Sequence, residues 1–145
     1  MLFRSVGDLD VVNTDAIHRL LSAEFIPVFC AITHNGHGQL LNTNADTIAS
    51  RLATGMSAHY EVKLYLCLDK NGVLSNPEDD ASVIPEMNAA DYERFKAEGV
   101  VYAGMLPKLD NAFEALSQGV KEVIICGPVW FLFRLFSFFV QNFLR

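Results

Sequence analysis

Cysteine is scarce in this sequence, and its spacing matches no disulfide framework. Three cysteines occur among 145 residues, an odd number without the regular spacing of a cross-linked domain. Each of Cys30, Cys67 and Cys126 lies in an apolar run typical of a strand. We therefore exclude a disulfide scaffold and expect three reduced core thiols in a cytoplasmic protein.

Positive charge is also scarce, and it is dispersed along the chain. The sequence has 11 lysines and arginines against 17 aspartates and glutamates, for a net charge of −6. Because no basic cluster marks a surface for a phosphate backbone, we expect no nucleic-acid partner. The chain is 51% hydrophobic and 19% charged, a balance typical of one globular domain rather than of a disordered chain.

The two ends of the chain differ in composition from the middle. The opening MLFRS is too short and too polar for a secretory signal, and we expect residues 1–5 to be a non-native leader. Residues 128–145 hold six of the 11 phenylalanines and the single tryptophan, but Arg134 interrupts a stretch barely long enough to cross a membrane. An interfacial helix and a segment foreign to the fold are two interpretations of this Phe-rich tail. We expect the folded domain at residues 6–127.

Strand-like apolar runs alternate with helical patterns between those ends. The expected strands cover residues 25–32, 62–68 and 120–126. Signals for a helix start stand at Asn13 or Thr14, at Asn44, at Asn88 and at Pro107. A short hairpin is expected between residues 73–74 and 82–84. Strands that alternate with helices predict the α/β class with a mostly parallel sheet.

Polar clusters fall where a ligand would bind such a sheet. GQLLNTNAD follows the first expected strand, DKNG follows the second, and YAGMLPK precedes the last helix. Ligands in open α/β sheets bind beyond the carboxyl ends of the strands. Asn44 has a structural explanation as a helix cap, and Asp46 suits the first turn of a helix. Asn42 has no such explanation, which makes it a candidate binding residue.

The last helix places a basic residue where the helix dipole disfavours it. Lys108 lies in the first turn, where the N-terminus already carries partial positive charge. A bound anion would make this placement favourable, and phosphate is the natural candidate because helix N-termini bind phosphate through backbone N–H groups. The alternative is a lysine that extends into solvent, since such dipole effects amount to only about 0.3–1 kcal/mol.

Two weak metal-like patterns do not match known ligand sets. His34 and His37 stand near Cys30 but lack a fourth ligand. The segment that begins at Asp69 has glycine at its fourth rather than its sixth position and no glutamate at its twelfth, unlike a calcium loop. We predict no protein-bound metal and interpret DKNG as a turn whose backbone could contact a nucleotide.

Three segments carry a family resemblance. They are FIPVFCAI followed by GHGQLLNTNADTIASRLA, then VKLYLCLDKNGVL, then AGMLPKLDNAFEALSQGVKEVIIC. With N-x-N-A-D and G-M-x-x-K-L in this order, residues 6–127 resemble the C-terminal, nucleotide-binding half of the acetylglutamate kinases, in the amino acid kinase superfamily. The resemblance implies a three-layer αβα fold with a mostly parallel sheet. Glutamate 5-kinases share the second motif but differ at the first, so they rank second.

The resemblance implies phosphorylation of the side-chain carboxylate of an N-acylglutamate by ATP with Mg²⁺, in arginine biosynthesis in the cytoplasm. The full-length enzyme would be a homo-oligomer. Lys108 would stabilise the transferring phosphoryl group, Asp46 would organise the catalytic lysines, and Asn42 and Asn44 would bind the acylglutamate. The nucleotide-binding residues implied are Asp69, Lys70, Asn71, Gly72, Val73, Leu74, Val100, Val101, Tyr102, Gly104 and Met105.

Parts of the family pattern do not occur in these 145 residues. The family has a glycine-rich strand–loop with another catalytic lysine, and a second glycine loop and an arginine that hold the substrate. Neither is found here, and no G-T strand follows Gly127. We therefore expect a fragment with a foreign leader and tail that is catalytically inactive or nearly so. The alternative is a non-catalytic half-kinase that binds a nucleotide or a partner chain.

Overall fold

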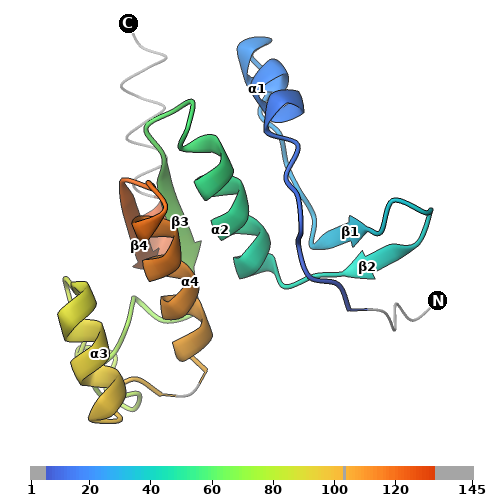
Figure 1. The fold of residues 1–145 in the computed structure, drawn as a ribbon. Coiled ribbons are helices and arrows are strands. Elements are labelled where there is room, and N and C mark those ends of the chain that lie inside the picture. Colours follow the sequence, from blue (N-terminus) through green and yellow to red (C-terminus); the bar gives the residue numbers. More distant parts are fainter. Residues whose placement is uncertain (1–5, 103, 133–145) are drawn as a thin grey trace, which may run out of the picture. The chain divides into compact units, whose positions relative to one another are not determined.

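The computed structural model (Figure 1) describes residues 6–102 and 104–132. It divides into two compact units. The first unit comprises Met1–Leu64 with Glu114–Glu122, and the second comprises Tyr65–Phe113 with Val123–Arg145. The predicted leader, Ala103 and residues 133–145 of the predicted tail lie outside the described residues. Residues 128–132 are helical, with the Phe131 N–H donating to the Gly127 carbonyl at 3.2 Å.

The first unit begins with a capped helix and a hairpin. Helix α1 (Thr14–Ser22) is capped by Asn13, whose side-chain oxygen accepts the Ala16 N–H at 3.0 Å, as predicted. Strands β1 (Ile32–His34) and β2 (Leu40–Asn42) pair antiparallel, with Ile32 opposite Asn42. In the connecting turn, Gly36 and Gly38 adopt left-handed backbone conformations, with φ angles of 78° and 87° that other residues rarely adopt.

The prediction of a strand at residues 25–32 is wrong except for its last residue, Ile32. Strand β1 begins only at Ile32, and the run before it is exposed, with Ile26 at 81% and Val28 at 92%. A continuous apolar run forms a strand covered on both faces only when other elements supply the cover. Among the described residues no strand pairs with residues 26–30. This segment therefore has the apolar sequence of a buried strand but no neighbouring strand within the described part of the chain.

Helix α2 (Ala45–Met56) follows the hairpin in the chain. The Asn44 side chain caps it by accepting the Thr47 N–H at 3.0 Å, which confirms the predicted helix start. One face of the helix buries Ser50, Ala53 and Met56. This spacing of three residues matches the helical period, which places residues i and i+3 on the same face.

The second sheet pairs β3 (Lys63–Cys67) with β4 (Glu122–Cys126). The Lys121 N–H donates to the Val62 carbonyl at 3.0 Å, and the Leu68 N–H donates to the Cys126 carbonyl at 2.9 Å. Because both strands advance in the same direction between these two bonds, the pair is parallel. The α/β class with a parallel sheet is thus confirmed, although the β1–β2 pair is antiparallel.

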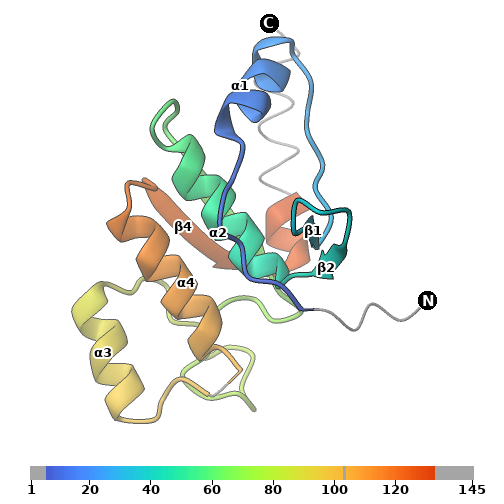
Figure 2. The same ribbon diagram turned by 45° about the vertical axis from the view of Figure 1, so that its right-hand side comes forward.

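The second unit contains α3 (Ala89–Ala97) and most of α4 (Leu106–Ser117). Asn88, a predicted helix start, forms a capping box with Asp91 at the start of α3. The predicted short hairpin is present as a bridge between Leu74 and Val83. Helix α4 begins one residue before the predicted Pro107, and Figure 2 shows α3 and α4 side by side.

A polar cluster joins α3 to α4. The Tyr92 hydroxyl donates to the Asp110 carboxylate at 2.6 Å, and the Lys96 ammonium lies 3.1 Å from the same oxygen. Burial, followed by the bond to Asp110, raises the pKa of Tyr92. The hydrogen bond from Tyr92, followed by that from Lys96, lowers the pKa of Asp110. Asp110 therefore stays ionised and holds the first half of α4 against α3.

The three cysteines do not share the environment predicted for them. Cys126 is 3% exposed, whereas Cys30 and Cys67 are exposed, and all three are free thiols. The prediction of core thiols is wrong for Cys30, which belongs to the uncovered run, and for Cys67, which ends a strand with alternating burial. Burial raises the pKa of the Cys126 thiol to about 11.

Alkylation by iodoacetamide at pH 8 is expected to modify Cys30 and Cys67 in the folded chain and to spare Cys126. The thiolate is the reactive form, and burial keeps Cys126 protonated and covered at this pH. We expect Cys126 to react at least about 100-fold more slowly than the exposed thiols, and at a similar rate in concentrated urea. Peptide mass spectrometry over a time course measures the three rates. Equal rates in the folded chain would contradict the buried placement.

Among the described residues, no helix has the length and hydropathy that crossing a membrane requires.

Candidate nucleotide and substrate site

The predicted substrate residues lie where β2 passes into α2. Asn42 is the last residue of β2 and is exposed, Asn44 caps α2, and Asp46 lies half-buried in the first turn. Between them, Thr43 is 4% exposed. Its hydroxyl donates to the Gly7 carbonyl at 3.0 Å and lies 2.7 Å from the Thr33 hydroxyl. These bonds anchor the turn, so that Asn42 and Asp46 stand on a fixed backbone.

His34, from one of the weak metal-like patterns, has a structural role in the hairpin. Its Nδ1 accepts the Gly36 N–H at 3.0 Å in the turn between β1 and β2. No group of three or more His, Cys, Asp or Glu side chains suited to a metal ion is found within residues 6–102 and 104–132.

The predicted nucleotide loop, residues 69–74, follows β3 and enters the core. The Lys70 N–H donates to the Asp69 carboxylate at 3.1 Å, and the Lys70 ammonium pairs with Asp80 at 2.6 Å. The hydrogen bond to Asp80 raises the pKa of Lys70. Val73 and Leu74 are buried, at 7% and 2% exposed, so the second half of the loop is anchored by its side chains. Its first half is held by local turn bonds and the Lys70–Asp80 pair.

Helix α4 starts without an acidic residue in its first turn. The Met105 carbonyl accepts hydrogen bonds from the N–H groups of Lys108 at 3.1 Å and Leu109 at 3.0 Å. Pro107 has no backbone N–H and therefore needs no acceptor. Lys108 is half-buried in this first turn. The positive end of the helix dipole and the lysine therefore coincide, an arrangement that favours an anion.

One buried cluster joins the predicted nucleotide-binding segments to α4. Val73 comes from the loop after β3, Val101 from the segment after α3, and Met105 and Leu109 from the start of α4; all pack with Tyr92. Met105 is only 1% exposed. Three segments that are separate in sequence are thus held around the α4 N-terminus by a shared core. Tyr102 and Gly104 stay exposed beside it.

Gly127 is a residue of this site that the sequence analysis missed. It directly follows β4, and a Cβ placed on it would lie 2.9 Å from Asn71 Oδ1 and 3.3 Å from the Lys70 carbonyl. A side chain at position 127 would crowd the backbone of Lys70 and Asn71, so glycine suits this close approach of β4 to the predicted nucleotide loop. The available signal was a glycine at the carboxyl end of an apolar strand, where ligands of α/β sheets bind.

Gly127→Ala is expected to weaken nucleotide binding about tenfold, because the new methyl group would displace Asn71 and the loop backbone. Calorimetric titration with ATP measures the change. Gly36→Ala is the control, since a Cβ at Gly36 meets nothing within 4 Å, although its φ of 78° strains the hairpin turn of the first unit. If the two variants lost affinity equally, the contact between Gly127 and the loop would have no special role.

The predicted site residues fall into two groups, one in each unit. Asn42, Asn44 and Asp46 lie in the first unit, and Lys108 with the nucleotide-binding residues lies in the second. Each group is assembled within its own unit. Their joint action in one site stays a prediction from the family resemblance.

The comparisons with known proteins cover the segments that contain both groups of predicted residues. Residues 2–127 match the model of the amino acid kinase family. The chain is 48% identical over 120 residues to acetylglutamate kinase of Bacteroides fragilis strain ATCC 25285 and 50% identical to that of Azobacteroides pseudotrichonymphae, in each case over 83% of this chain and 46% of the relative. The solved structure of smu.665 from Streptococcus mutans UA159 superposes with a TM-score of 0.72 at 29% identity, covering 83% of this chain and 46% of that one.

The match covers both groups of predicted residues and ends at Gly127. The chain spans about half the length of the curated relatives that it matches. With the family model matched over most of its residues, this chain belongs to the amino acid kinase family.

Proposed function

We propose that this chain is the nucleotide-binding part of an acylglutamate kinase, which transfers a phosphoryl group from ATP to the side-chain carboxylate of N-acetyl-L-glutamate in arginine biosynthesis. The observation that carries the proposal is the start of α4, where Lys108 stands in a first turn without acidic residues. Buried Met105 ties that turn to the loop after β3. The relatives named acetylglutamate kinase support the choice of acceptor. The cytoplasm is the proposed location.

The residues of the second unit suit a nucleotide. The α4 N-terminus and Lys108 offer positive charge, and Gly127 with the 69–74 loop brings two stretches of backbone close together without a side chain between them. A polyphosphate needs this combination of cationic groups and closely approaching backbone. ATP bound with Mg²⁺ would supply the phosphoryl group and a neutralising dication.

The proposed chemistry assigns positioning and charge stabilisation to the chain's own residues. The Lys108 ammonium would stabilise the charge on the oxygens of the transferring phosphoryl group. Since the Asn44 oxygen already accepts the Thr47 N–H, its amide N–H groups and those of Asn42 would donate to the acceptor. Asp46 would orient lysines near the acceptor. A carboxylate acceptor is itself nucleophilic, so the proposal needs no general base.

Two assays on the purified chain test this function. We expect saturable ATP binding with one-to-one stoichiometry by calorimetry. We also expect little or no acyl phosphate in a hydroxamate trap with MgATP and N-acetylglutamate, because these 145 residues do not include the glycine-rich loop and second catalytic lysine that the family resemblance implies. A folded, monodisperse chain that fails to bind ATP would overturn the nucleotide-binding role. Robust hydroxamate formation would overturn the proposed inactivity of the isolated chain.

A non-catalytic nucleotide-binding module is the second candidate, favoured by the shared core that joins the predicted nucleotide-binding segments within one unit. N-acetylglutamate distinguishes the two. A kinase part that keeps Asn42 and Asn44 for the acceptor is expected to show a thermal shift with N-acetylglutamate in the presence of ATP, and a smaller one with glutamate. A module without a substrate role would respond to neither acid. A larger response to glutamate would favour a glutamate 5-kinase.

A further inference from the structure

Cys67 and Cys126 lie beside each other at the carboxyl end of the β3–β4 pair. The Leu68 N–H donates to the Cys126 carbonyl at 2.9 Å, and in a parallel ladder this bond sets Cys67 opposite Cys126. Neighbouring strands are about 4.8 Å apart, which falls within the Cα–Cα range of about 4.4–6.8 Å that disulfides span. The two thiols also hydrogen-bond to each other. The backbone therefore already has the spacing that a disulfide requires.

The two thiols differ in their access to solvent. Cys67 is exposed, whereas Cys126 is 3% exposed. Tyr65, on the same face of β3 as Cys67, contacts the rings of Trp130 and Phe131, with ring centroids 6.3 Å and 6.0 Å away. A reagent in solution therefore reaches the Cys67 sulfur first. Cys126 is placed to react with Cys67 rather than with the reagent.

The cysteine pair adjoins the predicted nucleotide loop on both strands. Residues 69–74 begin two positions after Cys67, and Gly127 directly follows Cys126. A Cβ placed on Gly127 would lie 3.3 Å from both the Asn71 Cα and the Lys70 carbonyl oxygen, so the end of β4 touches the loop backbone. Because packed segments leave no free space, a movement of the Cys126 backbone toward Cys67 would be transmitted to residues 70 and 71.

We propose that Cys67 and Cys126 are a redox-active pair that exchanges with small-molecule disulfides, and that the intramolecular disulfide so formed shifts the loop at residues 69–74. The Cys67 thiolate attacks one sulfur of the small disulfide, whose sulfur–sulfur bond breaks and releases one thiolate. Cys126 then loses its proton and attacks the Cys67 sulfur, which releases the second thiolate. The released thiolates take up the two protons that the cysteines lost. Two protein thiols are thus oxidised by two electrons, and one small disulfide is reduced to two thiols.

Contact between the thiols offsets the low reactivity of Cys126. Burial raises the pKa of its thiol to about 11, so little thiolate is present at neutral pH. An intramolecular reaction between groups in contact has an effective concentration far above that of a small thiol in solution. At equilibrium in a glutathione buffer, we therefore expect the intramolecular disulfide to exceed the mixed disulfide at Cys67 at least about tenfold. This thiol chemistry does not depend on nucleotide binding.

The test treats the folded full chain with glutathione disulfide over a time course. Acid quenching, digestion without reductant and mass spectrometry identify the linked peptides. We expect one peptide pair joined through Cys67 and Cys126, a chain mass lower by two hydrogen atoms, and complete reversal by reduced glutathione. Hydrogen exchange measures the loop, and we expect the amides of Asn71 and Gly72 to change their exchange rates at least about threefold on oxidation.

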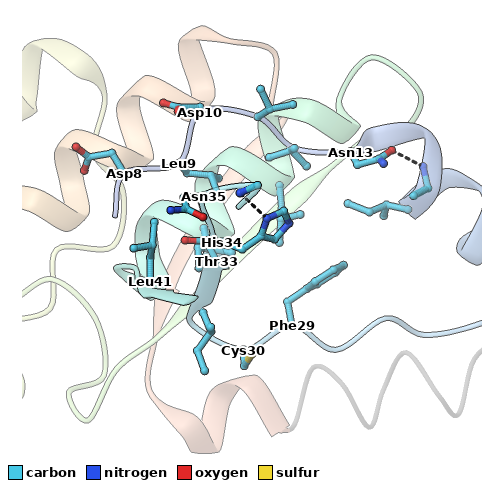
Figure 3. Close-up of a pocket in the computed structure, with 18 of the residues that line it drawn as sticks. Asp8, Leu9, Asp10, Asn13, Phe29, Cys30, Thr33, His34, Asn35 and Leu41 are labelled. Atoms are coloured by element: carbon cyan, nitrogen blue, oxygen red, sulfur yellow. Dashed lines mark hydrogen bonds between the residues drawn. The ribbon is translucent and has the colours of Figure 1, made fainter. Parts of the chain in front are cut away.

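Each cysteine has a variant that isolates its role. Cys126→Ser should stop the reaction at the mixed disulfide between Cys67 and glutathione. Cys67→Ser changes an exposed side chain, so the chain should fold normally while Cys126 stays unmodified over the same time course. Cys30→Ser is the matched control. Figure 3 shows Cys30 on the stretch of the first unit that leads into β1, and replacing this exposed thiol should leave the Cys67–Cys126 bond unchanged.

Four other outcomes overturn the proposal. They are a mixed disulfide at Cys67 that persists in the unsubstituted chain, a disulfide that includes Cys30, a disulfide between two copies of the chain, and equal loop exchange in the oxidised and reduced chain. The readouts are peptide linkage, mass and amide exchange, and none of them uses ATP. A chain that binds ATP without closing the disulfide therefore loses only the redox proposal, and a chain that closes the disulfide without binding ATP loses only the nucleotide role.

Discussion

Replacing Lys108 with methionine is expected to weaken ATP binding to this chain about tenfold and to leave adenosine binding unchanged. The ammonium stands in the first turn of α4, where the helix dipole is positive and no acidic residue occurs. A tenfold loss corresponds to about 1.4 kcal/mol, a reasonable value for one charge-assisted contact to a phosphate. Adenosine has no phosphate, so its affinity should not depend on this charge. Calorimetric titration with both ligands at constant ionic strength measures the difference.

Two further variants separate charge from shape. Lys108→Arg keeps the positive charge and should retain most of the affinity for ATP, although its planar head differs from an ammonium. Lys121→Met removes a lysine that pairs with Glu61 at 2.6 Å in the first unit, and it should change neither affinity. If Lys108→Met weakened ATP and adenosine equally, the lysine would be supporting the local fold rather than meeting a phosphate.

Met105→Ala is expected to lower the free energy of unfolding by about 3 kcal/mol, within the range measured for truncating buried methionines. Met105 is 1% exposed and packs with Val73, Val101 and Leu109, which come from three segments of the proposed nucleotide-binding region. The cavity would therefore loosen the loop and the start of α4 together. Urea denaturation measures the stability, and we expect the midpoint to fall while the slope stays constant. ATP affinity should fall with it.

Leu116→Ala is the matched control for this truncation. Leu116 lies on the same helix but is 36% exposed, so less apolar surface returns to water and we expect a loss below about 1 kcal/mol. Equal losses in the free energy of unfolding for the two variants would contradict a special role of Met105 in packing the loop against the start of α4.

Local features of the fold were predictable because they depend on few neighbouring residues. Asn13 and Asn44 cap the helices that the sequence assigned to them, and Asn88 with Asp91 forms the capping box. A cap needs one side-chain oxygen and the N–H groups two or three residues later, all of which are visible in a short stretch. The start of α4 was displaced by one residue because Met105 provides the capping carbonyl.

Features that need distant partners were not predictable in the same way. The apolar run at residues 25–32 has the pattern of a buried strand, but burial depends on elements that cover it. Cys30 and Cys67 are exposed for related reasons, one in that run and one at the end of a strand with alternating burial. Gly127 approaches Asn71 only because β3 and β4 pair, which brings residues far apart in sequence together.

The sequence by itself determined the family, the α/β class, the helix starts and the positions of the N-x-N-A-D and G-M-x-x-K-L elements. These features depend on residue types at short spacings, which a linear chain displays directly. Only the tertiary structure decided which apolar runs are covered, that Met105 joins the loop after β3 to α4, and that Gly127 lies close against the backbone of Lys70 and Asn71. Burial and close backbone approach arise when segments distant in sequence pack together, so no local pattern contains them.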